Sequence, residues 1–123
     1  MSIIHKFSEK QDQFQWDGVD DIPFDTGGIQ SVTKHILIGE KEDAPNSIMR
    51  YFDLAPGGHS KLERHPQEHE VLVIRGKGNV QIGENNFLVK PFDAVFIDGN
   101  ELHQFSNPFD HPFGFICVIP RKS

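Results

Sequence analysis

Short stretches of alternating apolar and polar residues, each ended by a turn-forming residue, fill the chain from Gly28 to Pro120. Alternation with a period of two places apolar side chains on one face of a strand, and glycine, proline, asparagine and aspartate supply the turns. The expected strands cover residues 32–39, 47–54, 59–65, 70–75, 79–82, 87–90, 94–97, 101–105 and 113–119. Strands at this spacing, with no convincing helix among them, are typical of a sandwich or barrel. We therefore expect an all-β fold of jelly-roll type, which leaves few strand edges exposed.

The N-terminal part of the chain is patterned more weakly. Phe14 and Trp16 alternate with glutamines, as in a short strand, and Trp16 needs a surface against which it can be buried. We expect residues 1–30 to form an arm whose strand packs on the barrel exterior or is swapped onto a partner subunit. Residues 31–123 form the single barrel domain. The remaining edges of its sheets favour a homodimer.

Composition excludes several classes of protein. A chain of 123 residues has the length of one domain with a modest core. Its formal charge is −6 and it contains no basic cluster, so we expect no nucleic-acid partner. The single cysteine, Cys117, cannot form an intramolecular disulfide. No run approaches the ~20 apolar residues of a membrane span, and the N-terminus lacks the apolar core of a signal peptide. We therefore expect a cytoplasmic protein without a membrane partner.

Four residues with metal-binding side chains lie between positions 59 and 69, namely His59, Glu63, His65 and His69. On a strand, Glu63 and His65 share a face and are separated by roughly 6.6 Å, a distance over which both side chains can reach one ion. His69 begins the returning strand after the turn at residues 66–67. His59 lies about 13 Å along the strand from Glu63, and we expect it at the rim.

A further histidine, His103, lies on another expected strand, two residues before Phe105. Together with Glu63, His65 and His69 it would provide three imidazoles and one carboxylate. This set suits a divalent transition metal such as Fe, Mn, Zn, Ni or Cu, with open positions for a small molecule. Structural thiolate zinc is excluded, because no cysteine lies in the cluster. A calcium site is not expected, because calcium prefers oxygen ligands.

Two segments resemble the paired motifs of the cupin superfamily. They are E-R-H-P-Q-E-H-E-V-L-V-I-R-G-K-G, at residues 63–78, and P-F-D-A-V-F-I-D-G-N-E-L-H-Q-F-S-N, at residues 91–107. The resemblance covers roughly residues 47–119 and is greatest to small single-domain cupins. It implies a double-stranded β-helix, that is, a jelly-roll barrel, with a metal ion in its interior.

The resemblance also implies the ligand positions. Glu63, His65 and His69 occupy those of the first motif, and His103 that of the second, with Asn107 as its trailing asparagine. The sequence departs from the usual pattern at two positions. Glu63 replaces the first histidine, and His69 replaces the usual acidic residue, as in the four-histidine subgroup.

Function is less sharply defined. The resemblance implies a metal-dependent enzyme, and we expect one of dioxygenase type acting on a small oxygen-bearing organic molecule. The alternatives are a metal-dependent isomerase of a sugar acid or keto acid, and a non-catalytic module that binds a small molecule or metal. Fold alone does not decide between them. The expected pocket-lining residues are Phe105, Tyr51, Met49, Arg50, Phe115 and Cys117. An interior Arg50 would favour a substrate that carries a carboxylate, whereas an exterior one would be an ordinary surface charge, and the sequence leaves both open.

Overall fold

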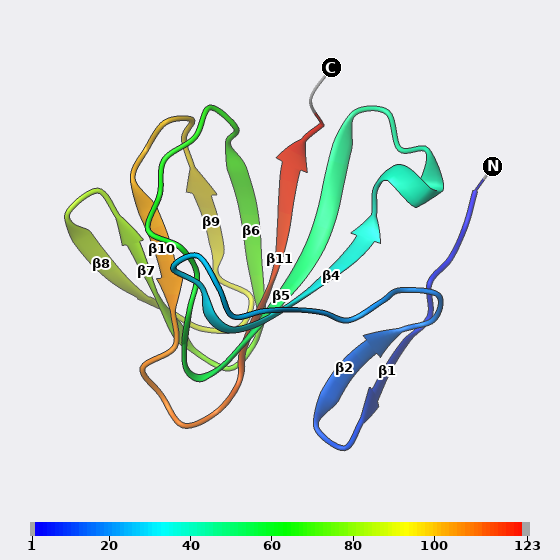
Figure 1. Ribbon diagram of the computed structural model, residues 1–123, viewed down its shortest axis with the longest axis horizontal. Coiled ribbons are helices and arrows are strands. Elements are labelled where there is room, and N and C mark those ends of the chain that lie inside the picture. Colours follow the sequence, from blue (N-terminus) through cyan, green and yellow to red (C-terminus); the bar gives the residue numbers. More distant parts are fainter. Residues whose placement is uncertain (1, 122–123) are drawn as a thin grey trace.

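The structure is a computed structural model that describes residues 2–121, and these residues form an all-β protein as expected (Figure 1). Its one helical segment among these residues is a 3-10 turn at Glu40–Glu42, within a charged connection. The strands are β1 (Phe7–Lys10), β2 (Gln13–Trp16), β3 (Ile22–Phe24), β4 (Gln30–Ile38), β5 (Ser47–His59), β6 (His69–Arg75), β7 (Gly78–Ile82), β8 (Asn85–Val89), β9 (Ala94–Ile97), β10 (His103–Ser106) and β11 (Phe113–Pro120). No helix among the described residues is long and apolar enough to cross a membrane.

One curled antiparallel sheet contains nearly all of the strands. Its order is β8-β7-β10-β5-β11-β6-β9, and β4 pairs with β5 and carries β3 along its other edge. The 13-residue strand β5 is the hub, because it pairs with β4, β10 and β11. Figure 1 shows the strands fanned around a common axis, with β8 on one side and β4 on the other. This curl turns one face of the sheet inward.

The alternation along β5 and β11 decides which side chains face inward. Arg50 pairs with Cys117, and Phe52 pairs with Phe115, so these four side chains share the inner face. The inner face carries the hydrophobic core, which consists of Val32, Leu54, Val71, Val73, Val80, Val89, Ile97, Phe105, Phe113, Phe115 and Cys117. The polar side chains that face inward therefore pack against this apolar core.

The N-terminal arm forms the hairpin β1–β2, a two-stranded sheet of its own beside the curled sheet (Figure 1). The rings of Phe14 and Trp16 pack on Tyr51 of β5, with centroid separations of 5.7 and 5.0 Å. Trp16 also contacts His35 of β4 at 5.7 Å. The hairpin thus covers the outer face of β4 and β5, and Trp16 packs on the barrel exterior.

The chain around residues 56–65 differs from the sequence-based expectation. We expected a turn at Pro56–Gly58 and a strand at residues 59–65, whereas β5 continues to His59. The backbone NH of Gly57 donates to the carbonyl of Asn107, and the NH of Asn107 donates to the carbonyl of Gly58, both at 2.8 Å. Gly57 has φ +82°, so the strand passes through an irregular position that glycine tolerates. The following segment makes one isolated bridge, Glu63 to His103.

Candidate metal centre

Three histidines from separate parts of the chain converge inside the curled sheet. His65 lies in the connection between β5 and β6, His69 is the first residue of β6, and His103 is the first residue of β10. One ligand atom from each lies within 4.8 Å of the other two. The ring centroids are separated by 4.7, 4.9 and 4.8 Å, which is a nearly equilateral triangle. These three histidines therefore lie close enough to hold one metal ion.

Hydrogen bonds on the far side of two rings fix their orientation. The Nδ1 atom of His103 lies 2.8 Å from the carbonyl of Glu101, and the Nδ1 atom of His69 lies 3.0 Å from the Sγ atom of Cys117. A carbonyl oxygen is an acceptor only, so His103 donates through Nδ1–H and keeps its Nε2 lone pair free. Such second partners orient histidine ligands in metal sites. Both rings are therefore fixed in orientation, and His103 has its Nε2 atom available to an ion.

The contact between His65 and His69 tests whether this group fits a metal ion. Their Nε2 atoms are 2.9 Å apart. Two nitrogens at about 2.1 Å from one ion, at right angles, would be separated by about 3.0 Å. The Nδ1 atom of His65 is buried and has no hydrogen-bond partner. With the ligand atom of His103 within 4.8 Å of this pair, the three imidazoles form a donor set suited to a first-row divalent ion, and the residues fit it.

The protonation state of His69 also favours metal binding. Burial lowers the pKa of His69 to about 3, and the positive charges of His103, His65 and Arg50 act in the same direction. His69 is 8% exposed and His103 is 4% exposed. A metal ligand must offer a neutral imidazole, and His69 is neutral at physiological pH.

The three histidines stand in the wall of a cavity of about 410 Å³. Its other walls are mainly apolar, and the rings of Phe105 and Phe115 stack at 4.4 Å within it. The charged side chains of the lining are Lys34, Arg50, Lys61 and Glu63, three cations and one carboxylate. The cavity is therefore more positive than the protein, whose formal charge is −6.

Four of the six expected lining residues are in this wall, namely Arg50, Phe105, Phe115 and Cys117. Tyr51 and Met49 are not among the lining residues. By alternation they lie on the opposite face of β5 from Arg50 and Phe52. Tyr51 is fully buried there beneath the N-terminal hairpin, and its hydroxyl donates to Asp53 at 2.7 Å. The Tyr51 ring therefore packs against Phe14 and Trp16 of the arm and does not line the cavity.

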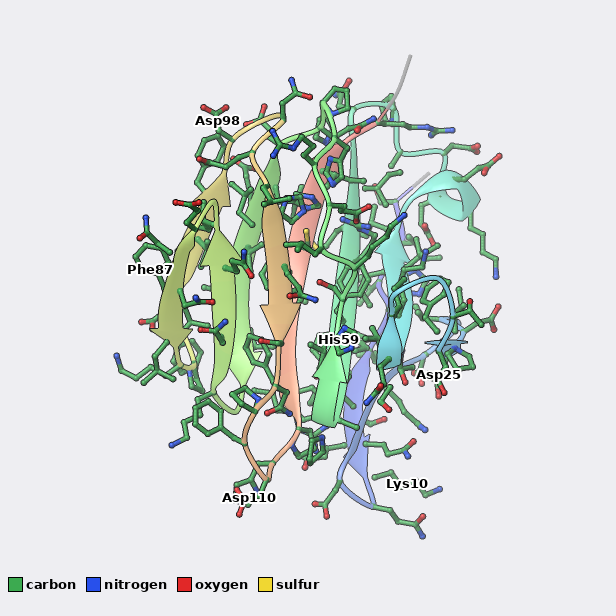
Figure 2. All side chains as sticks on the ribbon, turned by 60° about the vertical axis from the view of Figure 1, so that its left-hand side comes forward. Lys10, Asp25, His59, Phe87, Asp98 and Asp110 are labelled. Atoms are coloured by element: carbon green, nitrogen blue, oxygen red, sulfur yellow. The ribbon has the colours of Figure 1, made fainter. Side chains whose placement is uncertain are left out.

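Glu63 lines the cavity but lies outside the group of three histidines. Its backbone pairs with His103, with N···O distances of 3.1 and 2.9 Å. This pairing brings the segment of residues 60–68 against β10 without making it a regular strand. His59 lies at the end of β5, labelled in Figure 2, and its Nδ1 atom contacts the Ser60 carbonyl at 3.0 Å. His59 is neither in the group of three nor among the lining residues, in keeping with the strand-spacing argument.

Sequence reasoning missed the wall of the cavity formed by β3 and β4. Lys34 and Val32 point into the cavity from β4, and Phe24 and Ile29 line it from the arm and its connection. Alternation along residues 32–38 would have placed Val32 and Lys34 on one face. Whether this face of β4 is turned toward the cavity or toward the exterior depends on how β4 pairs with β5. No local sequence pattern specifies that pairing.

Comparison with known proteins agrees with this geometry. The family model described as a cupin domain matches residues 50–119. The chain belongs to the cupin family. The small-cupin fold expected from the paired motifs is therefore confirmed. The group observed contains the three expected histidines without Glu63, and the resemblance to the four-histidine subgroup stays a prediction.

Among curated proteins, this cupin is similar to the 1-methylthio-D-xylulose 5-phosphate methylsulfurylase of Rhodospirillum rubrum. The two are 37% identical over 116 residues, which cover 92% of this chain and 73% of the relative. Among solved structures, it resembles a cupin-2 domain protein from Rhodospirillum rubrum, at 36% identity and a TM-score of 0.84, with 94% and 78% of the two chains covered. A cupin-2 conserved barrel protein from Rhodopseudomonas palustris matches at 32% identity and a TM-score of 0.82, with 95% and 81% covered.

Proposed function

We propose that this cupin is a divalent-metal-dependent enzyme that acts on a small phosphorylated keto sugar. The observation that carries the proposal is the convergence of His65, His69 and His103 in the wall of a cavity large enough for a small molecule. The similarity to the methylsulfurylase supports the substrate class, because it extends over 92% of the chain. We propose 1-methylthio-D-xylulose 5-phosphate, or a close analogue, as the compound to test first.

The chain's own residues can be assigned roles on this basis. His65, His69 and His103 would hold the ion, and a bound divalent ion supplies Lewis-acid polarisation of a carbonyl group. Phe105 and Phe115 form an apolar wall that excludes water from the bound substrate. Glu63 provides the carboxylate among the lining residues. We assign it to the metal as a fourth ligand, as expected from its place in the first motif.

The experiment combines metal analysis with turnover. Protein purified without chelators is expected to contain close to one transition-metal ion per chain, and His65→Ala is expected to lose it. Incubation with 1-methylthio-D-xylulose 5-phosphate and a small thiol, followed by mass spectrometry, is expected to show the methylthio group on the thiol sulfur as a mixed disulfide, with the thiol's hydrogen in its place on the sugar. If no transition metal binds on titration, the metal centre is refuted.

The same samples distinguish the alternatives. Oxygen uptake with the substrate would favour the dioxygenase, and a rearranged sugar without loss of sulfur would favour the isomerase. Saturable binding without turnover would favour a non-catalytic module. The cytoplasmic location and the homodimer remain predictions from the sequence, and size-exclusion chromatography with light scattering tests the latter.

A further inference from the structure

Two cations on the inner face lack a counter-ion. Lys34 of β4 is paired with Phe52 of β5, and Arg50 lies two residues from Phe52 on the same face. This diagonal relation brings Lys34 and Arg50 within reach of each other. The ion pairs formed by residues 2–121 include neither of them. Two adjacent cations therefore face the cavity, and neither is in an ion pair with Glu63, the carboxylate of the cavity wall.

The guanidinium of Arg50 is only partly satisfied. One of its NH2 groups lies 3.3 Å from the Sγ atom of Cys117, and its planar group rests on the Phe52 ring with 4.8 Å to the centroid. Its Nε–H is buried and has no hydrogen-bond partner. A buried charged donor without a partner is unfavourable, and the Cys117 sulfur is the only side-chain acceptor of this guanidinium among residues 2–121.

The second cation, Lys34, is partly removed from water. Burial lowers the pKa of Lys34, and the positive charge of Arg50 lowers it further. The ammonium stands 4.7 Å above the Phe24 ring, a contact that stabilises the cation without neutralising its charge. An anionic group placed between Lys34 and Arg50 would relieve their repulsion and accept hydrogen bonds from the guanidinium.

We propose that Arg50 and Lys34 form a subsite for the phosphate group of the substrate, in the same cavity as the three histidines. This inference deepens the proposed function and rests on it for the rest of the substrate. A phosphate monoester carries close to two negative charges at neutral pH and therefore matches both cations. A carboxylate would leave one of them uncompensated. Arg50 is suited to hold phosphate through several N–H groups, and Lys34 acts as a point charge.

The position of Arg50 relates this subsite to the metal centre. The Sγ atom of Cys117 lies 3.3 Å from Arg50 and 3.0 Å from Nδ1 of His69. A single sulfur atom therefore separates the phosphate-binding guanidinium from a metal-binding imidazole. A short substrate can occupy both sites, with its phosphate at Arg50 and its reacting end toward Nε2 of the histidines. Arg50 and Lys34 would thus position and select the substrate.

The test measures how much the phosphate contributes to binding. Calorimetry gives the affinities of the metal-loaded protein for D-xylulose 5-phosphate and for D-xylulose, and their ratio isolates the phosphate. We expect a ratio of at least about 100 in the unaltered protein, and a decrease of at least about 10-fold in Arg50→Gln and in Lys34→Gln, since one charge-assisted hydrogen bond contributes about that factor. The matched control is Lys90→Gln, whose side chain is 76% exposed and outside the cavity. It is expected to keep the ratio.

Several outcomes would overturn the assignment. They are a ratio near one in the unaltered protein, or an unchanged ratio in both variants. If D-xylonate binds as tightly as the phosphate ester and depends on the same residues, the subsite is for carboxylates and the phosphate assignment is refuted. Lys34→Gln keeps the test valid if Arg50→Gln fails to fold, because Lys34 is only partly buried. Metal content is measured in the same samples, so a failed subsite with metal and turnover intact leaves the proposed function standing. A retained phosphate ratio without metal binding refutes the proposed function alone.

Discussion

The Nδ1 atom of His69 lies 3.0 Å from the Sγ atom of Cys117, across the antiparallel pairing of β6 and β11. This contact holds the His69 ring with its Nε2 atom toward His65. Cys117 is buried, and burial raises the pKa of its thiol, so its role is that of a positioning group rather than a nucleophile. The sulfur atom thus links β11 to the group of three histidines through His69.

Replacing Cys117 tests this positioning role. Cys117→Ala removes the partner of His69 Nδ1 and is expected to weaken metal binding about 10-fold, the lower end of the effect of such partners. Cys117→Ser keeps a polar atom there and is expected to retain most of the affinity. Val73→Ala is the control. Val73 is as buried as Cys117 and lies on β6, but its side chain cannot form a hydrogen bond with a metal-binding histidine. Equal metal affinity in Cys117→Ala and Val73→Ala, by competition with a fluorescent chelator, would contradict the prediction.

The sequence predicts part of the fold and of the candidate site. Period-two patterns predicted most strands, because alternation is a local property. The motif resemblance placed His65, His69 and His103 together, which the structure confirms as a spatial group. The sequence could not decide the direction of Arg50 or the cavity wall formed by Lys34, because both depend on the pairing of β4 with β5. Tyr51 was wrongly expected in the cavity wall. The hairpin that buries it on the opposite face is distant in sequence, so no local pattern shows the contact.

Glu63 is the site residue whose role most needs measurement. As the proposed fourth ligand it must turn from its position in the cavity wall toward the three histidines. Glu63→Gln is expected to lower metal affinity about 10-fold, and His65→Ala about 100-fold or more, because Gln keeps a neutral oxygen whereas Ala removes a nitrogen donor. Metal affinity unchanged in Glu63→Gln, together with lost turnover, would reject the ligand assignment and identify Glu63 as a proton-transfer group.

The pKa of His69 makes the stability of the metal-free protein depend on pH. In the folded state burial lowers this pKa to about 3, whereas the unfolded imidazole has its ordinary value of 6.5. Between these values the unfolded chain binds a proton that the folded chain does not. The contribution of this group to the free energy of unfolding is therefore constant above pH 6.5. Below pH 6.5 the free energy of unfolding decreases as the pH falls, by up to about 1.4 kcal/mol per pH unit. Burial also lowers the pKa of His35, which acts in the same direction.

Urea denaturation of metal-free protein between about pH 4.5 and 7.5 measures this dependence. His69→Gln is expected to flatten the decrease below pH 6.5, while the exposed His111→Gln leaves it unchanged. Identical pH profiles for the unaltered protein and His69→Gln would show that His69 does not cause the loss.

Asn107 illustrates a motif residue whose role is structural. It is 1% exposed, and its side-chain amide donates to the carbonyls of Leu54 and His111 at 2.9 and 2.7 Å. Its Oδ1 atom accepts from the NH of Phe109 at 3.0 Å. One side chain therefore satisfies three backbone groups where the chain leaves β10 and turns toward β11. A buried backbone group that loses its partner costs about 1–3 kcal/mol.

We expect Asn107→Ala to lower the free energy of unfolding by about 2–4 kcal/mol, because water can restore part of the lost hydrogen bonding. The control is Asn86→Ala on β8, an exposed residue whose amide oxygen accepts one side-chain bond from Asn79 at 3.0 Å. That change is expected to alter stability by less than about 0.5 kcal/mol. Denaturant titration at neutral pH compares the two variants. If Asn107→Ala is as stable as Asn86→Ala, the three bonds do not stabilise this turn.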